Sequence, residues 1–168
     1  MVLLRDGGQD TLTIERLCDA LQKTKGSFYH HFESMDAYLD AVLQAWEERN
    51  TNAPIEEANR KPSAAARRTT LGSVVKRLDS RLDIAVRAWG LRDARARAYV
   101  RRVDEARIRY LAELVPHELP RHKRLLLGRL QYAAFLGSQQ LDPTFDDADT
   151  KAVERLLKQA MAHLEGDP

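Results

Sequence analysis

The chain has 168 residues, of which 43% are hydrophobic, and 27 Lys and Arg against 25 Asp and Glu leave a net charge of +2. This length fits one domain, or a small arm and one domain, and the single cysteine, Cys18, excludes an internal disulfide bond. No apolar run approaches the roughly 20 residues that span a bilayer, and the apolar part of the N-terminus is too short for a signal peptide. We therefore expect a cytoplasmic protein with no membrane partner.

The spacing of apolar residues is helical in almost every segment, and no segment alternates as a strand would. Hydroxyl residues and glycines mark the helix ends in the first third of the chain. The helices expected there are one stopped by Gly7-Gly8, one capped by Thr13 and running to Leu21, one over residues 25–32, and one capped by Ser34.

Residues 50–63 hold two prolines and many polar residues, which predicts a loop. Three further helices are expected to begin at caps Ser63, Ser80 and Asp93, with Asp83 completing a capping box after Ser80. Pro116 and Pro120 bracket a turn. Two apolar helices over residues 125–141 and 150–164 complete an all-α prediction.

The sequence offers no set of residues that would support catalysis. In the segment "HELPRH", His117 and His122 are five residues apart with Pro120 between them, whereas two histidines that share a metal on one helical face are four apart. His30 and His31 are adjacent, so on a helix they diverge. We therefore expect no enzyme activity, no metal and no cofactor.

Two short helices joined by a turn of about three or four residues, at Thr13–Leu21 and Lys25–Phe32, have the spacing of a helix-turn-helix. In that motif the N-terminal residues of the second helix approach the bases of the DNA major groove. Here these residues are Thr24, Lys25, Gly26 and Ser27. Tyr29 and His30 can donate hydrogen bonds to phosphates, while Phe28 and Phe32, four residues apart, should face the core.

The segment "TLTIERLCDALQKTKGSFYHHFESMDAYLDAVLQAW" resembles the DNA-binding region of the TetR family of transcription regulators. The later segment "AVRAWGLRDARARAYVRRVDEARIRYLAEL" is similar to one branch of the same family. The resemblance implies an all-α homodimer, with a helix-turn-helix unit over residues 1–48 and an effector-binding and dimerisation domain over residues 49–168. Its implied partners are a palindromic double-stranded operator and a small-molecule effector of unknown identity, which releases this repressor from DNA.

Carried onto this sequence, the family pattern matches Lys25, Gly26 and Ser27 to base-facing positions and Thr24 to the usual cap. Tyr29 and His30 match phosphate contacts. With Thr13, at the start of the preceding helix, these residues form the expected DNA-binding set.

The sequence departs from the family pattern at four positions of the motif and at its beginning. Gln22 stands where the family has a turn glycine, Lys23 where it has an apolar residue, and Glu33 and Met35 where it has lysines. The first helix is short, the usual basic arm does not precede it, and residues 1–50 carry a net charge of −4. These departures keep a second hypothesis open, in which the same scaffold is a ligand-sensing or protein-interaction protein that has lost much of its DNA binding.

Aromatic residues in the middle of the chain either line a ligand pocket or fill the core. They are Trp89, Tyr99, Tyr110, Tyr132 and Phe135. Arg87 and Asp104 could form a partly buried ion pair.

The last two helices combine an apolar stripe with small residues such as Gly128 and Ala134, which allow close helix approach. The stripe could pack inside a monomer, but the resemblance favours a dimer interface. The residues expected there are Leu126, Leu130, Ala133, Gly137, Val153, Leu156, Leu157, Ala160 and Leu164.

Overall fold

A computed structural model of the chain describes residues 1–141, 148, 152–153, 155–156 and 159. Within these residues there are only helices, turns and bends and no strand, which confirms the all-α prediction. No helix among them is both long and apolar enough to cross a membrane. The helices are α1 (Val2–Gly7), α2 (Ile14–Leu21), α3 (Lys25–His31), α4 (Met35–Glu47), α5 (Ala53–Asn59), α6 (Ala64–Val75), α7 (Ser80–Gly90), α8 (Ala94–Glu113) and α9 (Arg121–Gln140), with a 3₁₀ turn η1 (Gln9–Thr11) and a π-helical turn η2 (Glu48–Asn52).

Most helices begin where the sequence predicts. The side chains of the expected caps accept a hydrogen bond from the backbone N–H three residues later, which satisfies one of the free donors at a helix start. The confirmed caps are Thr13, Ser34, Ser63 and Asp93. The predicted cap Ser80 is wrong, because the carboxylate of Asp79 accepts from the N–H of Arg81 and Ser80 is the first residue of α7.

The loop predicted over residues 50–63 is also wrong for most of its length. The chain continues from α4 through η2 into α5, and it leaves helical structure only after Asn59. Pro54 lies near the start of α5 and has no N–H to donate, and the carbonyl four residues earlier, that of Asn50, accepts instead from Nη2 of Arg107. Pro54 is therefore compatible with helix α5, although the prolines of this segment predicted a loop from the sequence alone.

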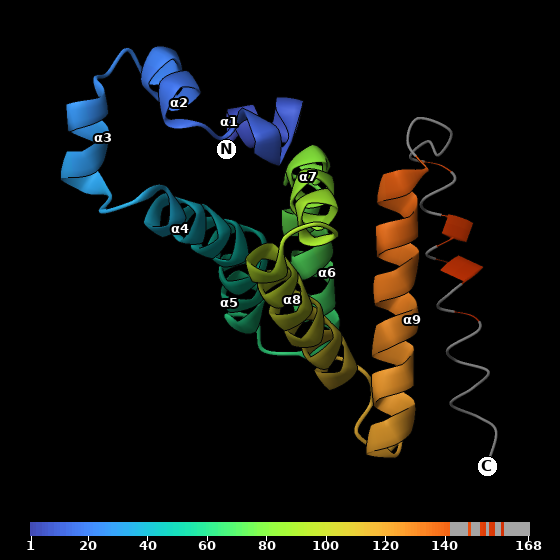
Figure 1. Cartoon of the computed structure of the whole chain (residues 1–168). Helices are drawn as coiled ribbons and strands as arrows, with labels where there is room; N and C mark the ends of the chain where they lie inside the picture. Colours follow the sequence, from blue (N-terminus) through green and yellow to red (C-terminus); the bar gives the residue numbers. More distant parts are fainter. Residues whose placement is uncertain (142–147, 149–151, 154, 157–158, 160–168) are drawn as a thin grey trace.

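Figure 1 shows α2 and α3 at one end of the molecule and α9 on the opposite side, with α4 leading from α3 to the helices between them. The main core cluster joins α1 and α4 to α7 and α8, and includes Leu4, Trp46, Val86 and Val103, none of which is exposed. This cluster therefore crosses the expected domain boundary at residue 48. A second, smaller cluster of Leu17, Cys18 and Phe28 holds α2 and α3 together.

The long helices α8 and α9 pack against each other over much of their length. The two helices approach closely at Gly128, since a Cβ atom added there would lie 2.7 Å from the carbonyl oxygen of Ile108 and 3.1 Å from the N atom of Ala112. The close approach at Gly128 thus serves a contact within the chain, whereas the sequence suggested a role between two chains.

Candidate nucleic-acid interface and helical cavity

The helices α2 and α3 form a helix-turn-helix whose two starts are fixed by threonines. Oγ1 of Thr13 accepts from the N–H of Arg16 at 3.3 Å, and Oγ1 of Thr24 accepts from the N–H of Ser27 at 3.1 Å. Between the helices, Gln22 has φ 52° and ψ 45°, a left-handed conformation that favours glycine. The turn therefore keeps the geometry for which a glycine would be the natural choice.

The short helix α3 has one face in the core and one face in solvent. Phe28 is 9% exposed and packs with Leu17 and Cys18, and Phe32 packs against the same cluster, as predicted. Tyr29, the next residue along, is 55% exposed, and His30 is exposed beside it. The outer face of α3 thus presents hydrogen-bonding side chains.

Lys25, at the start of α3, is paired within the protein. Its Nζ lies 2.5 Å from Oε1 of Glu15 on α2, and both side chains are largely exposed. This hydrogen bond raises the pKa of Lys25 and lowers that of Glu15. Lys25 must leave or share this partner to contact DNA.

Lys23 is exposed, and it borders a cavity of about 250 Å³ between α2, α3 and the start of α4. The cavity is lined mainly by apolar and aromatic side chains, among them Leu21, Phe28 and Tyr38. An apolar residue at position 23 would pack against these side chains, whereas the ammonium group of Lys23 stays in water. Met35, another of the four unusual positions, is half-buried and packs against both core clusters.

The acidic residues of α4 are paired with arginines of α8, a set that we call the α4–α8 charge ladder. Arg95 binds Asp36 at 2.9 Å and lies 3.5 Å from Asp40. Two turns later on α8, Arg102 binds both carboxylate oxygens of Glu47. A third of the acidic residues in the first 50 positions thus face basic partners on a distant helix.

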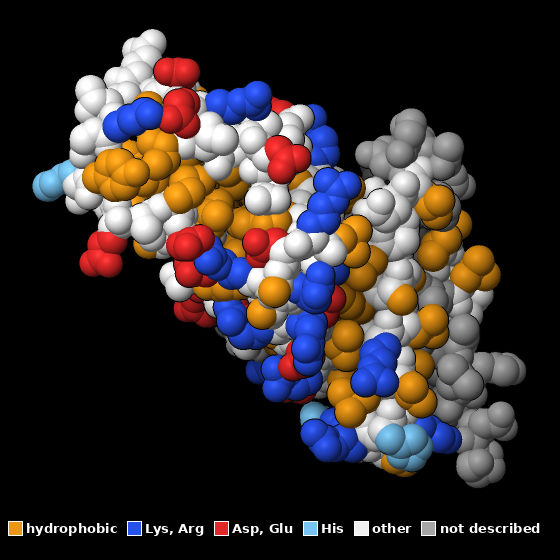
Figure 2. Space-filling model, viewed as in Figure 1, with side chains coloured by type: hydrophobic (Ala, Val, Ile, Leu, Met, Phe, Trp, Pro, Cys, Tyr) orange, Lys and Arg blue, Asp and Glu red, His pale blue; other side chains and the backbone are white. Residues whose placement is uncertain are grey.

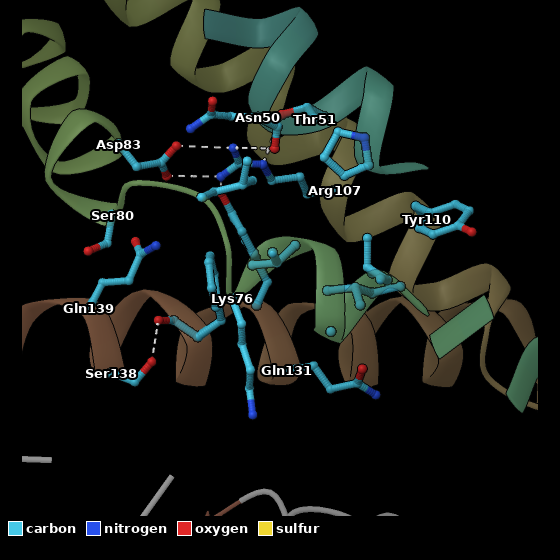
Figure 3. A pocket seen from close by; sticks show the side chains of 18 of the residues that line it. Asn50, Thr51, Lys76, Ser80, Asp83, Arg107, Tyr110, Gln131, Ser138 and Gln139 are labelled. Carbon is cyan, nitrogen blue, oxygen red and sulfur yellow. Dashed lines mark hydrogen bonds and ion pairs between the residues drawn. The ribbon is translucent and has the colours of Figure 1, made fainter. Parts of the chain in front are cut away.

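A cavity of about 750 Å³ lies between α6, α7, α8 and α9 (Figure 3). Three of the five aromatics expected to line a pocket, Tyr110, Tyr132 and Phe135, do line it. Trp89 and Tyr99 do not, because Trp89 is buried in the main core cluster and Tyr99 packs at its edge under the guanidinium of Arg102.

Arg107 of α8 forms the polar wall of this cavity and was not singled out from the sequence. Its Nη1 and Nη2 donate to the two carboxylate oxygens of Asp83 at 3.0 and 3.1 Å. Nε donates to the hydroxyl of Thr51, and Nη2 donates also to the carbonyl of Asn50, each at 3.0 Å. Asp83 further accepts from Nε1 of Trp46 at 2.9 Å. The network therefore connects the cavity wall to α4 and to the π-helical turn that follows it.

The ion pair between Arg87 and Asp104 is present, with Nη2 and Oδ1 2.5 Å apart. Tyr132 of α9 joins it, since its hydroxyl donates to Asp104 at 2.7 Å and accepts from Arg87 and from Arg107. Burial of Tyr132 raises the pKa of its hydroxyl far above the ordinary value. This second network fastens α9 to α7 and α8.

The outer face of α9 is apolar and exposed, as Figure 2 shows. Leu126 is 58% and Leu130 43% exposed, Ala133 is exposed on the same face, and Gly137 is half-buried with open space around it. Val153 is half-buried at the cavity and Leu156 is exposed. The remaining expected interface residues, Leu157, Ala160 and Leu164, lie outside the described residues.

Residues 1–42 match the family model of bacterial regulatory proteins, tetR family. The match spans α1, α2, α3 and the first half of α4, and so includes the whole helix-turn-helix. Neither the curated proteins nor the solved structures gave a match. With its helix-turn-helix and this match, the N-terminal part of the chain is a DNA-binding region of the tetR family of bacterial regulatory proteins.

Proposed function

We propose that this TetR-type DNA-binding regulator acts as a homodimer, binds a palindromic operator through α2 and α3, and is controlled by a small molecule in the 750 Å³ cavity. The observation that supports the DNA contact best is the capped, two-faced helix α3, within the segment that matches the family. Its exposed face would contact DNA through Lys25, Gly26, Ser27, Tyr29 and His30. Thr13 and Thr24 would contribute from the two helix starts.

The apolar face of α9 supports the homodimer. Two copies related by a twofold axis would bury Leu126 and Leu130 against each other, together with Ala133, and would present two recognition helices to DNA. The expected division into residues 1–48 and 49–168 then separates DNA reading from dimerisation and ligand binding.

Ligand control would act through the Arg107 network, because this network links the cavity wall to Trp46 of α4 and to η2. A ligand changes an equilibrium only by its difference in affinity for two states. A ligand that favours one arrangement of Arg107 and Asp83 would thereby favour one placement of α4 and of the helices that precede it.

The test is selection of genomic DNA fragments by the purified chain, followed by measurement of affinity against salt concentration. We expect a palindromic site whose affinity falls steeply with salt, since each phosphate contact releases a counterion. A variant with Lys25, Ser27 and Tyr29 all changed to alanine is the control, and it should select nothing.

The exposed Lys23 and the hollow beside it favour one competing function, that of a ligand sensor that no longer binds DNA. No enrichment of fragments by a folded dimer would establish this alternative and contradict the operator proposal. The N-terminal helices would then keep the helix-turn-helix fold without its DNA-binding function, and partners would be sought among proteins and small molecules.

A further inference from the structure

Arg68 of α6 is a positively charged residue of the 750 Å³ cavity. It lines the cavity, and its Nη2 donates to the carbonyl oxygen of Leu114 at 2.6 Å. Its Nε is buried and has no hydrogen-bond partner among the described residues. Within the part of the chain that the structure describes, no carboxylate pairs with it. A buried donor without an acceptor is costly, so the site is incomplete in the free protein.

The other cavity charges that the contacts assign are already matched. Asp83 is paired with Arg107, whose guanidinium N–H groups are taken up by Asp83, Thr51, Asn50 and Tyr132. Asp79 is paired with Arg5 at 3.2 Å. A ligand charge therefore finds no free partner in the Arg107 network, whereas Arg68 would accept an anion.

An orphan acceptor lies toward the opposite end of the same cavity. Oε1 of Gln139 is buried and has no hydrogen-bond partner in the part of the chain that the structure describes. Figure 3 shows Gln139 beside Ser80 at one end, with Tyr110 and Gln131 toward the other. Arg68 belongs to the Tyr110 end, because Leu114, whose carbonyl it binds, follows Tyr110 by one helical turn. Gln131 and Gln139 are eight residues apart on α9, which places the two ends about 12 Å apart.

Apolar side chains line the cavity between these two ends. They come from α5, α6, α8 and α9, and include Ile55, Leu71, Val75, Leu111 and Phe135. A cavity of this size and lining suits a small organic molecule that is mostly apolar and is oriented by a few polar groups.

We propose that the ligand of this cavity is an elongated apolar carboxylic acid, whose carboxylate binds Arg68 and whose far end carries a hydrogen-bond donor to Gln139. The inference rests on the proposed ligand control only for its consequence at DNA, since binding itself can be measured without DNA. A carboxylate completes the donors of Arg68 and also supplies the opposite charge, which a neutral ligand lacks.

Calorimetric titration of the full chain with decanoate, decanamide and 10-hydroxydecanoate tests the proposal. We expect decanoate to bind about tenfold or more tightly than decanamide, and 10-hydroxydecanoate to bind at least as tightly as decanoate. Equal affinity for decanoate and decanamide, or no binding of any of the three by the folded chain, overturns the proposal.

Three variants assign the carboxylate preference to one residue. Arg68→Gln should remove the preference for decanoate over decanamide, and Arg68→Lys, which keeps the charge, should retain part of it. Arg101→Gln removes the same charge from an exposed position of α8 and should leave the preference unchanged. If Arg68→Gln binds decanamide as the parent does but keeps the full preference for decanoate, the assignment to Arg68 is overturned.

The same ligands, added to a complex with selected operator DNA, separate this inference from the proposed function. Decanoate that binds in an Arg68-dependent manner without changing DNA affinity supports the ligand class and contradicts ligand control. Release of DNA by decanamide as effectively as by decanoate supports ligand control and overturns the ligand class.

Discussion

The guanidinium of Arg107 meets the carboxylate of Asp83 edge to edge, with both N–O distances close to 3 Å and both side chains nearly buried. The same guanidinium holds the carbonyl of Asn50 and the hydroxyl of Thr51. One cation thus joins α7, α8 and the turn after α4. Removal of its carboxylate partner would leave a buried charge without compensation, which is more costly than loss of an exposed pair.

The variant Asp83→Asn should lower the free energy of unfolding by about 3–5 kcal/mol at pH 7, measured by urea denaturation. Burial raises the pKa of Asp83, but the hydrogen bonds and charge of Arg107, with Arg87 and Trp46, outweigh burial and hold it below the ordinary value. Stabilisation by a carboxylate with a lowered folded pKa is full above the unfolded pKa and is lost as pH falls through the folded pKa. The difference between parent and variant should therefore shrink below about pH 4.

Asp36→Asn is the matched control, because Asp36 pairs with Arg95 at the surface and should cost less than about 1 kcal/mol. The double change of Asp83→Leu with Arg107→Met should recover much of the loss, since it removes both charges together. Equal destabilisation by Asp36→Asn and Asp83→Asn would contradict the role given to this ion pair.

Gln22→Gly should stabilise the protein by about 1 kcal/mol, because Gln22 holds a left-handed conformation that a side chain disfavours. Gln44→Gly makes the same chemical change at an exposed position inside α4, where it should destabilise by about 0.5–1 kcal/mol. Urea denaturation of both variants measures the two effects. We expect the free energy of unfolding to rise in Gln22→Gly and to fall in Gln44→Gly. A fall in both variants would show that glycine does not stabilise the turn at position 22.

Glu15→Gln should strengthen DNA binding, because it frees Lys25 to contact a phosphate or a base. The slope of log affinity against log salt should become steeper by up to about one unit, as expected for one further phosphate contact. Asp19→Asn, on the same helix and exposed, removes the same charge without freeing a lysine. It should leave the slope unchanged, and an identical effect of both variants would mean that charge alone matters.

Tyr29→Phe should weaken operator binding about fivefold, through loss of one hydrogen bond to a phosphate. The salt slope should stay constant because tyrosine carries no charge. Fluorescence anisotropy with labelled operator measures both quantities, with Tyr99→Phe on α8 as the control. Unchanged affinity of Tyr29→Phe would contradict the phosphate contact assigned to this hydroxyl.

Leu130→Glu should convert a dimer to a monomer in sedimentation experiments, because it places a charge in the middle of the apolar face of α9. Leu91→Glu is the control, since Leu91 is 78% exposed in the turn between α7 and α8, away from that face. A dimer that survives Leu130→Glu with unchanged affinity would exclude this face as the interface.

The sequence predicted most of the features that depend on neighbouring residues. The caps Thr13, Ser34, Ser63 and Asp93 could be found because an N-cap hydrogen bond joins residues only three positions apart. The left-handed turn at Gln22 could be expected only because the family pattern has glycine there. Both predictions needed no knowledge of how the helices pack.

Apart from the cap at Asp79 and the helical turns over residues 50–59, the features missed depend on residues far apart in the chain. Asp83 was interpreted as half of a capping box, and its actual partner, Arg107, is 24 positions away. The periodicity of Trp89 and Tyr110 shows that both face inward, but it does not distinguish a core position from a cavity wall. Only the packing of helices that are distant in the chain makes that distinction, and no local pattern encodes it.

The α4–α8 charge ladder reduces the electrostatic repulsion between the acidic N-terminal segment and an approaching nucleic acid. Asp36, Asp40 and Glu47 lie within reach of arginines whose chain positions are 50 or more residues later. The electric field at the recognition helix is therefore set partly by α8, a helix on the other side of α4. Selection on operator affinity could act on Arg95 or Arg102 and leave every residue of the helix-turn-helix unchanged.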